Sequence, residues 1–290
     1  MPLGLRCLQL VFSNLMEEIN IDTWEHFIQQ IDELRRECNN SADHVPGSGL
    51  LFRGQENSCW PLSTTLDRKQ LRISFQDYFG VISRIKSQIE SLTDQEWVIP
   101  QPPEIESLVK DYDKFSRELR AGERPWYAYM TYLRHHGFPS PLLDWTRSLY
   151  VAAYFAFGKA SEAANGRVSI YAYSARNFRI SGNNMRVLYR FGPHVKTHRR
   201  HVLQQSQYTM CIESTDESRF ESHDAVFVAG LHQQGVCWKF TIPSNERTRV
   251  LKLLDDHNLN AFSLFGSEES LMETLAIREF CFGPTQGGQS

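Results

Sequence analysis

Two kinds of apolar spacing alternate along this chain, and their order limits the folds that it can adopt. Segments with apolar residues at helical spacing are interleaved with short apolar runs of strand length. A strict alternation of strand and helix would predict a doubly wound parallel sheet, but the order here is irregular. The sequence therefore predicts an α+β fold, with a mixed central sheet and helices packed around it.

The individual elements follow from the same spacing. Asp22-Thr23 is placed to cap the first helix, and Ser244 is placed to cap a later one. The predicted helices are 24–38, 75–92, 104–119, 126–133, 151–157, 245–256 and 267–277. The predicted strands are 49–54, 142–146, 168–173, 208–212, 225–228 and 236–242.

The chain is long enough, at 290 residues, to bury a substantial core, either as one large domain or as a domain with a small subdomain. We divide it into an N-terminal extension at 1–20, a domain at 21–282 and a flexible tail rich in Gly, Gln and Ser at 283–290. The Pro-rich segment 98–103 is the strongest candidate for an internal linker.

Charge, hydropathy and cysteine spacing argue against several classes of protein. The formal net charge is −3, so binding to nucleic acid or anionic lipid would need a local basic patch. No apolar run approaches the roughly 20 residues of a membrane-spanning helix. The six cysteines are scattered without a Cys-x-x-Cys pair, which predicts buried free thiols and argues against a cysteine zinc site. We expect a soluble, cytoplasmic protein with no membrane partner.

The first candidate site is the end of the strand predicted at 49–54. Arg53 can present a planar fork of donors to a phosphate or carboxylate, and Gly54 lets a backbone approach closely. Gln55 follows directly. A purely structural role is also open, in which the arginine binds loop carbonyls and the glycine makes a turn.

The second candidate site is the stretch 135–146, which runs from a predicted helix end through a Pro-rich loop into a strand. Such rigid loops at strand ends often carry functional groups. Here too a structural role is open, in which the histidines cap the helix and the carboxylate bonds the loop. The polar and aromatic residues of this stretch include His135, His136, Asp144, Trp145 and Thr146.

Both stretches resemble the FRG-domain family, which is named for its (Phe/Tyr)-Arg-Gly motif. The resemblance extends from Trp24 to about residue 280. This chain departs from the family at Pro139-Ser140-Pro141, where members tend to have Pro-Thr-Arg, and at 204–209. The missing arginine removes a positive charge. The matching residues are Phe52-Arg53-Gly54-Gln55, Trp60-Pro61-Leu62, His135-His136-Gly137-Phe138-Pro139, Leu142-Leu143-Asp144-Trp145-Thr146 and Ala152-Ala153-Tyr154-Phe155-Ala156.

A more distant likeness is to the ADP-ribosyltransferases. It implies an NAD-consuming enzyme, similar to them in fold, whose acceptor is a protein or a nucleic acid. It implies that Arg53 holds the NAD phosphate and ribose, and that Asp144 and Thr146 belong to the second signature strand. The expected catalytic residues are His135, His136, Asp144 and Gln204, and the expected NAD-binding residues are Arg53, Gly54, Gln55, Trp145, Thr146 and Tyr154.

The chemistry of NAD cleavage adds two expectations. Trp145 or Tyr154 can stack on nicotinamide. The reaction passes through an oxocarbenium-like ribose, which a nearby carboxylate stabilises. By the likeness, Gln204 or Gln205 stands near the position of the catalytic glutamate, and a glutamine can only orient a hydroxyl, so Glu213 is the alternative carboxylate.

Two other functions remain open from the residues alone. His135, His136 and Asp144, with His198 or His201, could form the metal site of a hydrolase, although adjacent histidines rarely point to one side.

The second alternative is a non-catalytic module that binds nucleic acid or protein. The basic stretch 194–201 could grip phosphates, helped by flanking residues, and a solvated loop is the simpler interpretation. The flanking residues are Arg186, Tyr189, Arg190 and Phe191.

Overall fold

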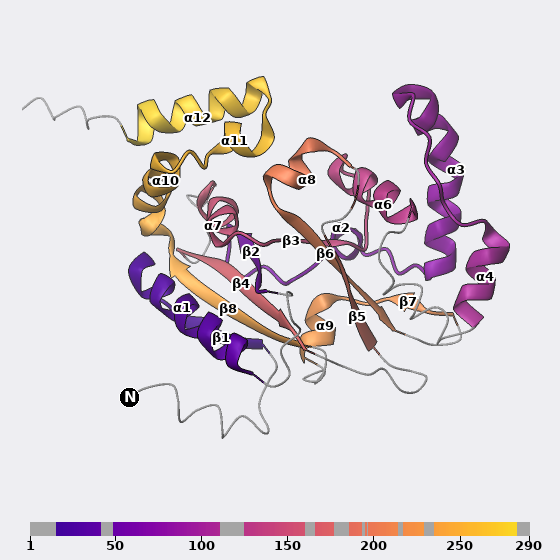
Figure 1. Ribbon diagram of the computed structural model, residues 1–290, viewed down its shortest axis with the longest axis horizontal. Helices are drawn as coiled ribbons and strands as arrows, with labels where there is room; N and C mark the ends of the chain where they lie inside the picture. The colour runs from indigo at the N-terminus through magenta and orange to yellow at the C-terminus, as the bar shows by residue number, and fades with distance from the viewer. Residues whose placement is uncertain are drawn as a thin grey trace, which may run out of the picture.

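One mixed β-sheet lies at the centre of the chain (Figure 1), which confirms the predicted fold class. The computed structural model describes residues 16–41, 49–110, 125–159, 166–176, 186–192, 195, 197–213, 217–228 and 235–282. In this part of the chain the strand order is β1-β8-β4-β2-β3-β6-β5, and β7 pairs with β6. β1 is parallel to β8, and the other pairs are antiparallel. The strands are β1 (Met16–Asn20), β2 (Leu51–Gln55), β3 (Leu143–Thr146), β4 (Arg167–Ala175), β5 (Arg186–Phe191), β6 (Ser206–Glu213), β7 (Arg219–Phe220) and β8 (Gly235–Pro243).

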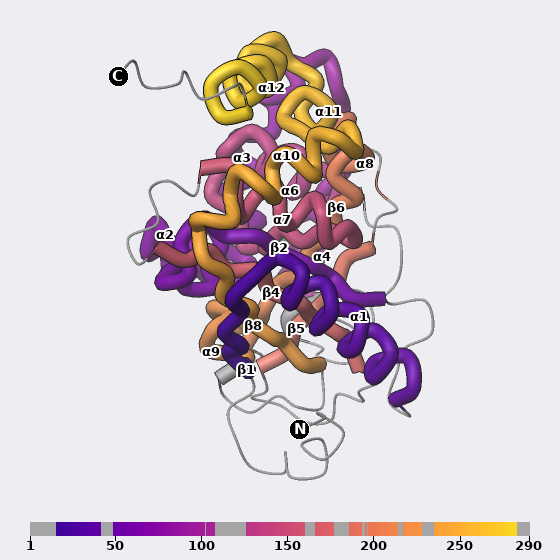
Figure 2. Tube along the Cα trace, turned by 90° about the vertical axis from the view of Figure 1, so that its left-hand side faces the viewer, coloured from indigo at the N-terminus to yellow at the C-terminus, as the bar shows by residue number. Residues whose placement is uncertain are grey.

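The helices surround this sheet, and α10, α11 and α12 follow one another toward one end of the molecule (Figure 2). Thr23 caps the first helix as predicted, since its hydroxyl accepts a hydrogen bond from the His26 amide over 3.2 Å. The helices are α1 (Trp24–Asn40), α2 (Thr65–Arg68), α3 (Phe75–Thr93), α4 (Pro102–Lys110), α6 (Pro125–His135), α7 (Leu149–Phe157), α8 (Arg199–Leu203), α9 (His223–Val228), α10 (Arg247–Asp256), α11 (Ala261–Phe265) and α12 (Glu268–Cys281).

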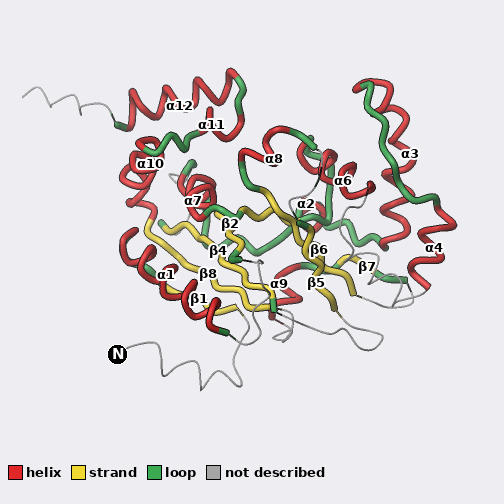
Figure 3. The backbone as a smooth tube through the Cα atoms, viewed as in Figure 1, coloured by secondary structure: helices red, strands yellow, loops and turns green. Residues whose placement is uncertain are grey.

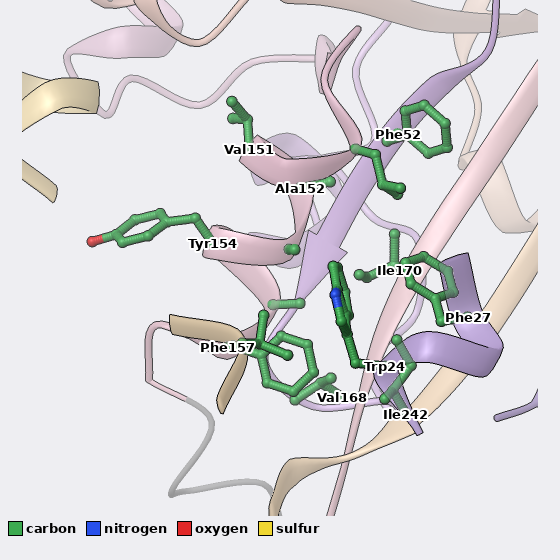
Figure 4. Close-up of a cluster of buried hydrophobic side chains, with 14 of the residues drawn as sticks. Trp24, Phe27, Phe52, Val151, Ala152, Tyr154, Phe157, Val168, Ile170 and Ile242 are labelled. Carbon is green, nitrogen blue, oxygen red and sulfur yellow. The ribbon is translucent and has the colours of Figure 1, made fainter. Parts of the chain in front are cut away.

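Two groups of helices pack on one face of the sheet (Figure 3). α1, α7 and α10 pack on β2, β4 and β8 around a cluster that includes Phe52 and Ile170 (Figure 4). α3 and α6 pack on β5 and β6 around a second cluster that includes Tyr208. The register pairs Phe52 with Thr146, and Thr146 with Ser206. Tyr208, two residues further along β6, therefore shares the face of Phe52.

The opposite face carries a third buried cluster, against which α9 packs through Phe227. Leu51 and Trp145 belong to it, each next in sequence to a residue of the first face. The sheet is therefore covered on both sides, and polar groups placed at its centre are withdrawn from bulk water.

Most predicted elements are present with shifted ends, and two expectations were wrong. Residues 225–228 lie in helix α9, because a short apolar run does not distinguish strand from helix and Ser222 Oγ accepts from the Ala225 amide at the helix start. Ser244 does not cap a helix. It lies in a 3-10 turn, Ser244–Glu246, and α10 begins after that turn without a side-chain cap.

Several segments lie outside these expectations. β1 was not predicted, because its sequence is mostly polar, yet it pairs with β8, so the sheet includes part of the proposed extension 1–20. β5 and α11 were not predicted either. Within the helix predicted at 104–119, α4 ends at Lys110 and residues 111–119 fall outside the described part, as does the tail 283–290.

The described residues also bear on the expectations about membrane-spanning helices and buried cysteines. None of the helices described here combines the length and apolar character needed to cross a membrane. Cys211 and Cys237 are buried as expected, whereas Cys59 is exposed. Cys7 lies outside the described residues. The free cysteines are Cys38, Cys59, Cys211, Cys237 and Cys281.

Candidate functional site

A cavity of about 670 Å³ opens near the centre of the sheet, beside the junction of β2 and β3. The register between these two strands holds a single pair, Phe52 with Thr146. Beside that pair, Nη1 of Arg53 donates to the main-chain oxygen of Asp144 over 2.8 Å, where a backbone donor would continue the ladder. The cavity walls come from β2, β3, β6, α2, α6, α7, α8 and α11.

Two arginines converge on one carboxylate in this cavity. Nη2 of Arg134, at the end of α6, donates to Oδ2 of Asp144. Nη1 of Arg53 lies 3.9 Å from the same oxygen. One carboxylate thus orients two guanidinium groups whose remaining donors are available to another anion.

Several buried polar atoms of the cavity lining have no hydrogen-bond partner among the described residues. A buried donor or acceptor without a partner costs about 1–3 kcal/mol, so polar partners in this cavity would stabilise these residues. Three are guanidinium donors, which require acceptors such as phosphate oxygens. The atoms are Arg53 Nε, Arg134 Nε, Arg200 Nε, Gln55 Oε1 and Asp144 Oδ1.

The cavity is cationic although the whole chain is slightly acidic. Arg53, Arg68, Arg134 and Arg200 line it, against the carboxylates of Asp144 and Glu56. Burial lowers the pKa of Arg53 to about 10, which still leaves the group charged at neutral pH. A formal excess of two positive charges in a partly enclosed space favours a ligand with at least two negative charges.

An aromatic region lies at the α7, α8 and α11 side of the same cavity. The guanidinium carbon of Arg200 lies over the ring of Phe265, 5.3 Å from its centre. Phe155 meets Phe265 edge to face at 6.1 Å, and both rings are only partly buried. Nε2 of Gln204 donates to the main-chain oxygen of Leu264 over 3.3 Å, which ties α8 to α11.

His135 lines the cavity in its neutral form. Burial lowers the pKa of His135 to about 4, and the nearby Asp144 only partly opposes this. The Nε2 atom of His135 lies 2.8 Å from the hydroxyl of Tyr208, which is itself 3.4 Å from Nδ1 of the buried His201. His135 therefore acts as a neutral hydrogen-bonding group at neutral pH.

Comparison with known proteins agrees with the motifs that form this cavity. Residues 48–165 match the model of the FRG domain. Over this segment the chain is similar to the FRG domain. No curated protein and no solved structure matches the chain. The matched segment includes β2, α6, β3 and α7, whereas α8, β6 and α11 follow it in the sequence.

Eight of the residues selected from the sequence line this cavity, from both halves of the chain. They come from β2, the end of α6, β3 and the turn before β6. They are Arg53, Gly54, Gln55, His135, Asp144, Trp145, Thr146 and Gln204. Thr146 has a positioning role, since its hydroxyl donates to the Gln204 carbonyl over 2.7 Å and accepts from the Ser148 amide.

The structure places the predicted stacking residues and His136 differently. The indole of Trp145 is 2% exposed, packs in the cluster on the opposite face and donates to Thr209, because alternation on β3 turns it away from Asp144. Tyr154 projects from α7 away from the sheet (Figure 4), and its hydroxyl donates to Glu273. His136 is exposed, packs on Tyr132 and does not line the cavity. Neither predicted aromatic ring is placed to stack on a ligand there.

Sequence reasoning missed four charged residues of the site. Glu56 directly follows the recognised motif, and Arg134 directly precedes the two histidines, so both were adjacent to a known signal. Arg68 carried no local signal, and Arg200 belonged to the basic stretch 194–201 but was not connected with this site; both lie on short helices brought to the cavity by the fold. Together, Arg68, Arg134 and Arg200 add three positive charges to the cavity lining.

The alternative sites were located as well. Within the ranges described, no group of three His, Cys, Asp or Glu residues could hold a metal ion. Glu213, the alternative carboxylate, pairs with Arg186 at the far end of β6 and does not line the cavity.

The basic stretch 194–201 does not form a single patch in the parts that are described. Tyr189 and Phe191 are buried and cannot stack on bases. Arg200 lines the cavity, and Arg190 donates to Gln207. His194 and Lys196 lie outside the described residues.

Proposed function

We propose that this protein binds NAD in the β2–β3 cavity and cleaves its N-glycosidic bond, in the manner of an ADP-ribosyltransferase. The observation that carries the proposal is the set of guanidinium donors that lack partners around one carboxylate, Arg53 and Arg134 with Asp144. A diphosphate supplies the acceptors that these donors require, and Arg68 adds a further charge. The cavity volume, about 670 Å³, lies in the range typical of small-molecule sites.

The reaction would break the bond between C1′ of the ribose and the nicotinamide nitrogen. The bonding electron pair stays on that nitrogen and neutralises the pyridinium ring, while C1′ becomes oxocarbenium-like. A hydroxyl of the acceptor, or water, then attacks C1′ and releases a proton. Arg53 and Arg134 would hold the diphosphate still while the ring departs, which lowers the entropic part of the barrier.

Glu56 is the carboxylate that we assign to the oxocarbenium ion. It lines the cavity from the end of β2 and can take the proton of the attacking hydroxyl. Asp144 is engaged by two guanidinium groups and acts as their counter-ion. Gln204 cannot accept a proton, so we assign it no acid–base step. His135, neutral and hydrogen bonded to Tyr208, lines the same cavity and is the group that we assign to carry the proton onward.

Arg53→Ala tests the proposal directly. We expect NAD and ADP-ribose binding to fall below detection in calorimetric titration, with a thermal unfolding curve close to that of the parent protein. Arg72→Ala, at an exposed arginine outside the cavity, is the matched control. Unfolding of the Arg53 variant would make Arg53 a structural residue.

Activity is tested with labelled NAD and a cell lysate. We expect release of nicotinamide by the purified protein, with or without label on a lysate component, and loss of that release in Glu56→Gln. Binding of an RNA oligonucleotide in place of NAD would favour the non-catalytic alternative. Absence of both NAD binding and NAD loss would overturn the proposal.

A further inference from the structure

Apart from Phe155, the aromatic region of the cavity is formed by residues that follow the FRG match, and the diphosphate chemistry proposed above does not use it. Arg200 and Gln204 lie one helical turn apart, and the Gln204 amide donates to the Arg200 carbonyl over 2.9 Å. Both side chains reach α11, where Arg200 lies over Phe265 and Gln204 binds the Leu264 carbonyl. α8 and α11 therefore present one continuous wall to the cavity.

The orientation of the Gln204 amide is fixed by its partner. The main-chain oxygen of Leu264 can only accept a hydrogen bond, so the NH₂ group of Gln204 must face it. The Oε1 atom on the other side has no partner among the described residues, and Gln204 lines the cavity. Oε1 of Gln204 thus offers an acceptor to a donor group of a ligand. It would repel a carbonyl oxygen of a ligand, because both atoms are acceptors.

Arg200 provides a flat surface beside that acceptor. A guanidinium is planar and stacks on aromatic rings, and one that already lies over Phe265 is held flat. Its buried Nε lacks a partner, and the edge of Phe155 borders the same space. A planar ring that stacks here would place its substituents next to Oε1 of Gln204.

We infer that Arg200, Gln204 and Phe265 form a subsite for the aromatic ring of the ligand, and that Gln204 selects rings that carry an amino group. The inference rests on the proposed function and names the group that the site recognises. In NAD that group is the amino group of adenine or the carboxamide NH₂ of nicotinamide. The two sources share the same chemistry, a planar ring with an exocyclic NH₂ donor.

Three dinucleotides of equal charge distinguish these sources. They are NAD, its hypoxanthine analogue, in which an oxygen replaces the purine amino group, and its acetylpyridine analogue, in which a methyl group replaces the carboxamide NH₂. We expect one analogue to bind about tenfold more weakly than NAD to the parent protein, because an acceptor then lacks its donor. The analogue that loses affinity identifies the ring at Gln204.

Gln204→Leu is the decisive variant. We expect it to bind NAD and the discriminated analogue equally, while Gln101→Leu, the same change at an exposed glutamine outside the cavity, keeps the preference. If Gln204→Leu does not fold, Arg200→Lys replaces it. That variant keeps the charge but not the plane, and should weaken NAD severalfold while inorganic pyrophosphate binds as before.

The possible results distinguish failure of the ring subsite from failure of the NAD site. Equal binding of all three dinucleotides to the parent protein would overturn the subsite and leave the NAD site intact. A preference that survives in Gln204→Leu would place the amino group elsewhere and would also overturn it. Failure of NAD itself to bind would overturn the proposed function and the subsite together.

Discussion

Two neighbouring residues of β2, Gly54 and Arg53, lie in regions that differ in packing. The backbone at Gly54 is tightly packed against a helix, whereas the side chain of Arg53 borders the cavity. At Gly54 the strand lies directly on α7, and a Cβ atom there would come within 1.9 Å of the Ala152 oxygen. At Arg53 the strand borders the cavity, with a guanidinium that is only partly satisfied. There is no room for an added atom at Gly54, whereas at Arg53 a guanidinium donor has no hydrogen-bond partner among the described residues. The comparison teaches that adjacent residues of one motif serve the fold and the ligand separately.

The packed region gives the largest predicted effect. Gly54→Ala should destabilise the protein by about 3 kcal/mol or more, because the new Cβ meets main-chain atoms of α7 that cannot move aside. Urea unfolding measures it. Gly80→Ala, in α3, is the control, since only the tip of Arg84 lies near that position and alanine favours a helix by about 0.5–1 kcal/mol. A mild effect at Gly54 would show that β2 can shift on α7.

A pH titration compares a fully buried histidine with one that borders the cavity. His223, at the start of α9 on the opposite face of the sheet, is fully buried, and burial lowers its pKa to about 3. Below its unfolded pKa near 6.5 the unfolded chain takes up a proton that the folded chain refuses. The free energy of unfolding should therefore fall by about 2 kcal/mol between pH 7 and pH 5 from this group.

The measurement is urea unfolding at both pH values. His223→Gln should reduce the pH dependence, and His136→Gln, at an exposed histidine, should leave it unchanged. His135, which borders the cavity, should contribute in the same direction but less, because water reaches it. An equal slope in His223→Gln and the parent protein would contradict the assignment of the buried region.

Asp144→Asn tests the cavity region. Removing the carboxylate removes the repulsion between it and a bound anion while both arginines remain. We expect affinity for pyrophosphate to rise roughly tenfold, with a small loss of stability, as measured by calorimetric titration. A fall in affinity would mean that Asp144 is needed to hold the arginines in position.

Tyr154→Phe should give the smallest effect. It removes the hydrogen bond of 2.9 Å to Glu273 on α12 and should cost about 1 kcal/mol of stability. NAD binding should not change, because the ring lies away from the cavity. Tyr150→Phe, at a half-exposed position of the same helix, serves as the control. Loss of NAD binding in Tyr154→Phe would show that the Tyr154 hydroxyl contributes to the NAD site.

Local patterns predicted the parts of this molecule that depend on local physics. The helices at α1 and α3 follow from apolar spacing and caps, and the strand at β2 follows from a short buried run that ends in a glycine. The association of Arg53 with the 135–146 stretch was also inferred correctly from two motifs. Residues 225–228 failed because a run of that length contains less than two helical turns of periodic information.

From the amino-acid order alone come the fold class, the motif arginine and the histidine-rich loop. Only the tertiary structure decides that the indole of Trp145 packs in the cluster on the opposite face and that the hydroxyl of Tyr154 reaches Glu273, since strand alternation and helix rotation determine the direction of these side chains. It also brings Arg68, Arg134 and Arg200 to one place from three helices. Residues that are distant in sequence come together only when whole helices and strands pack against one another. A short segment of sequence does not contain that information.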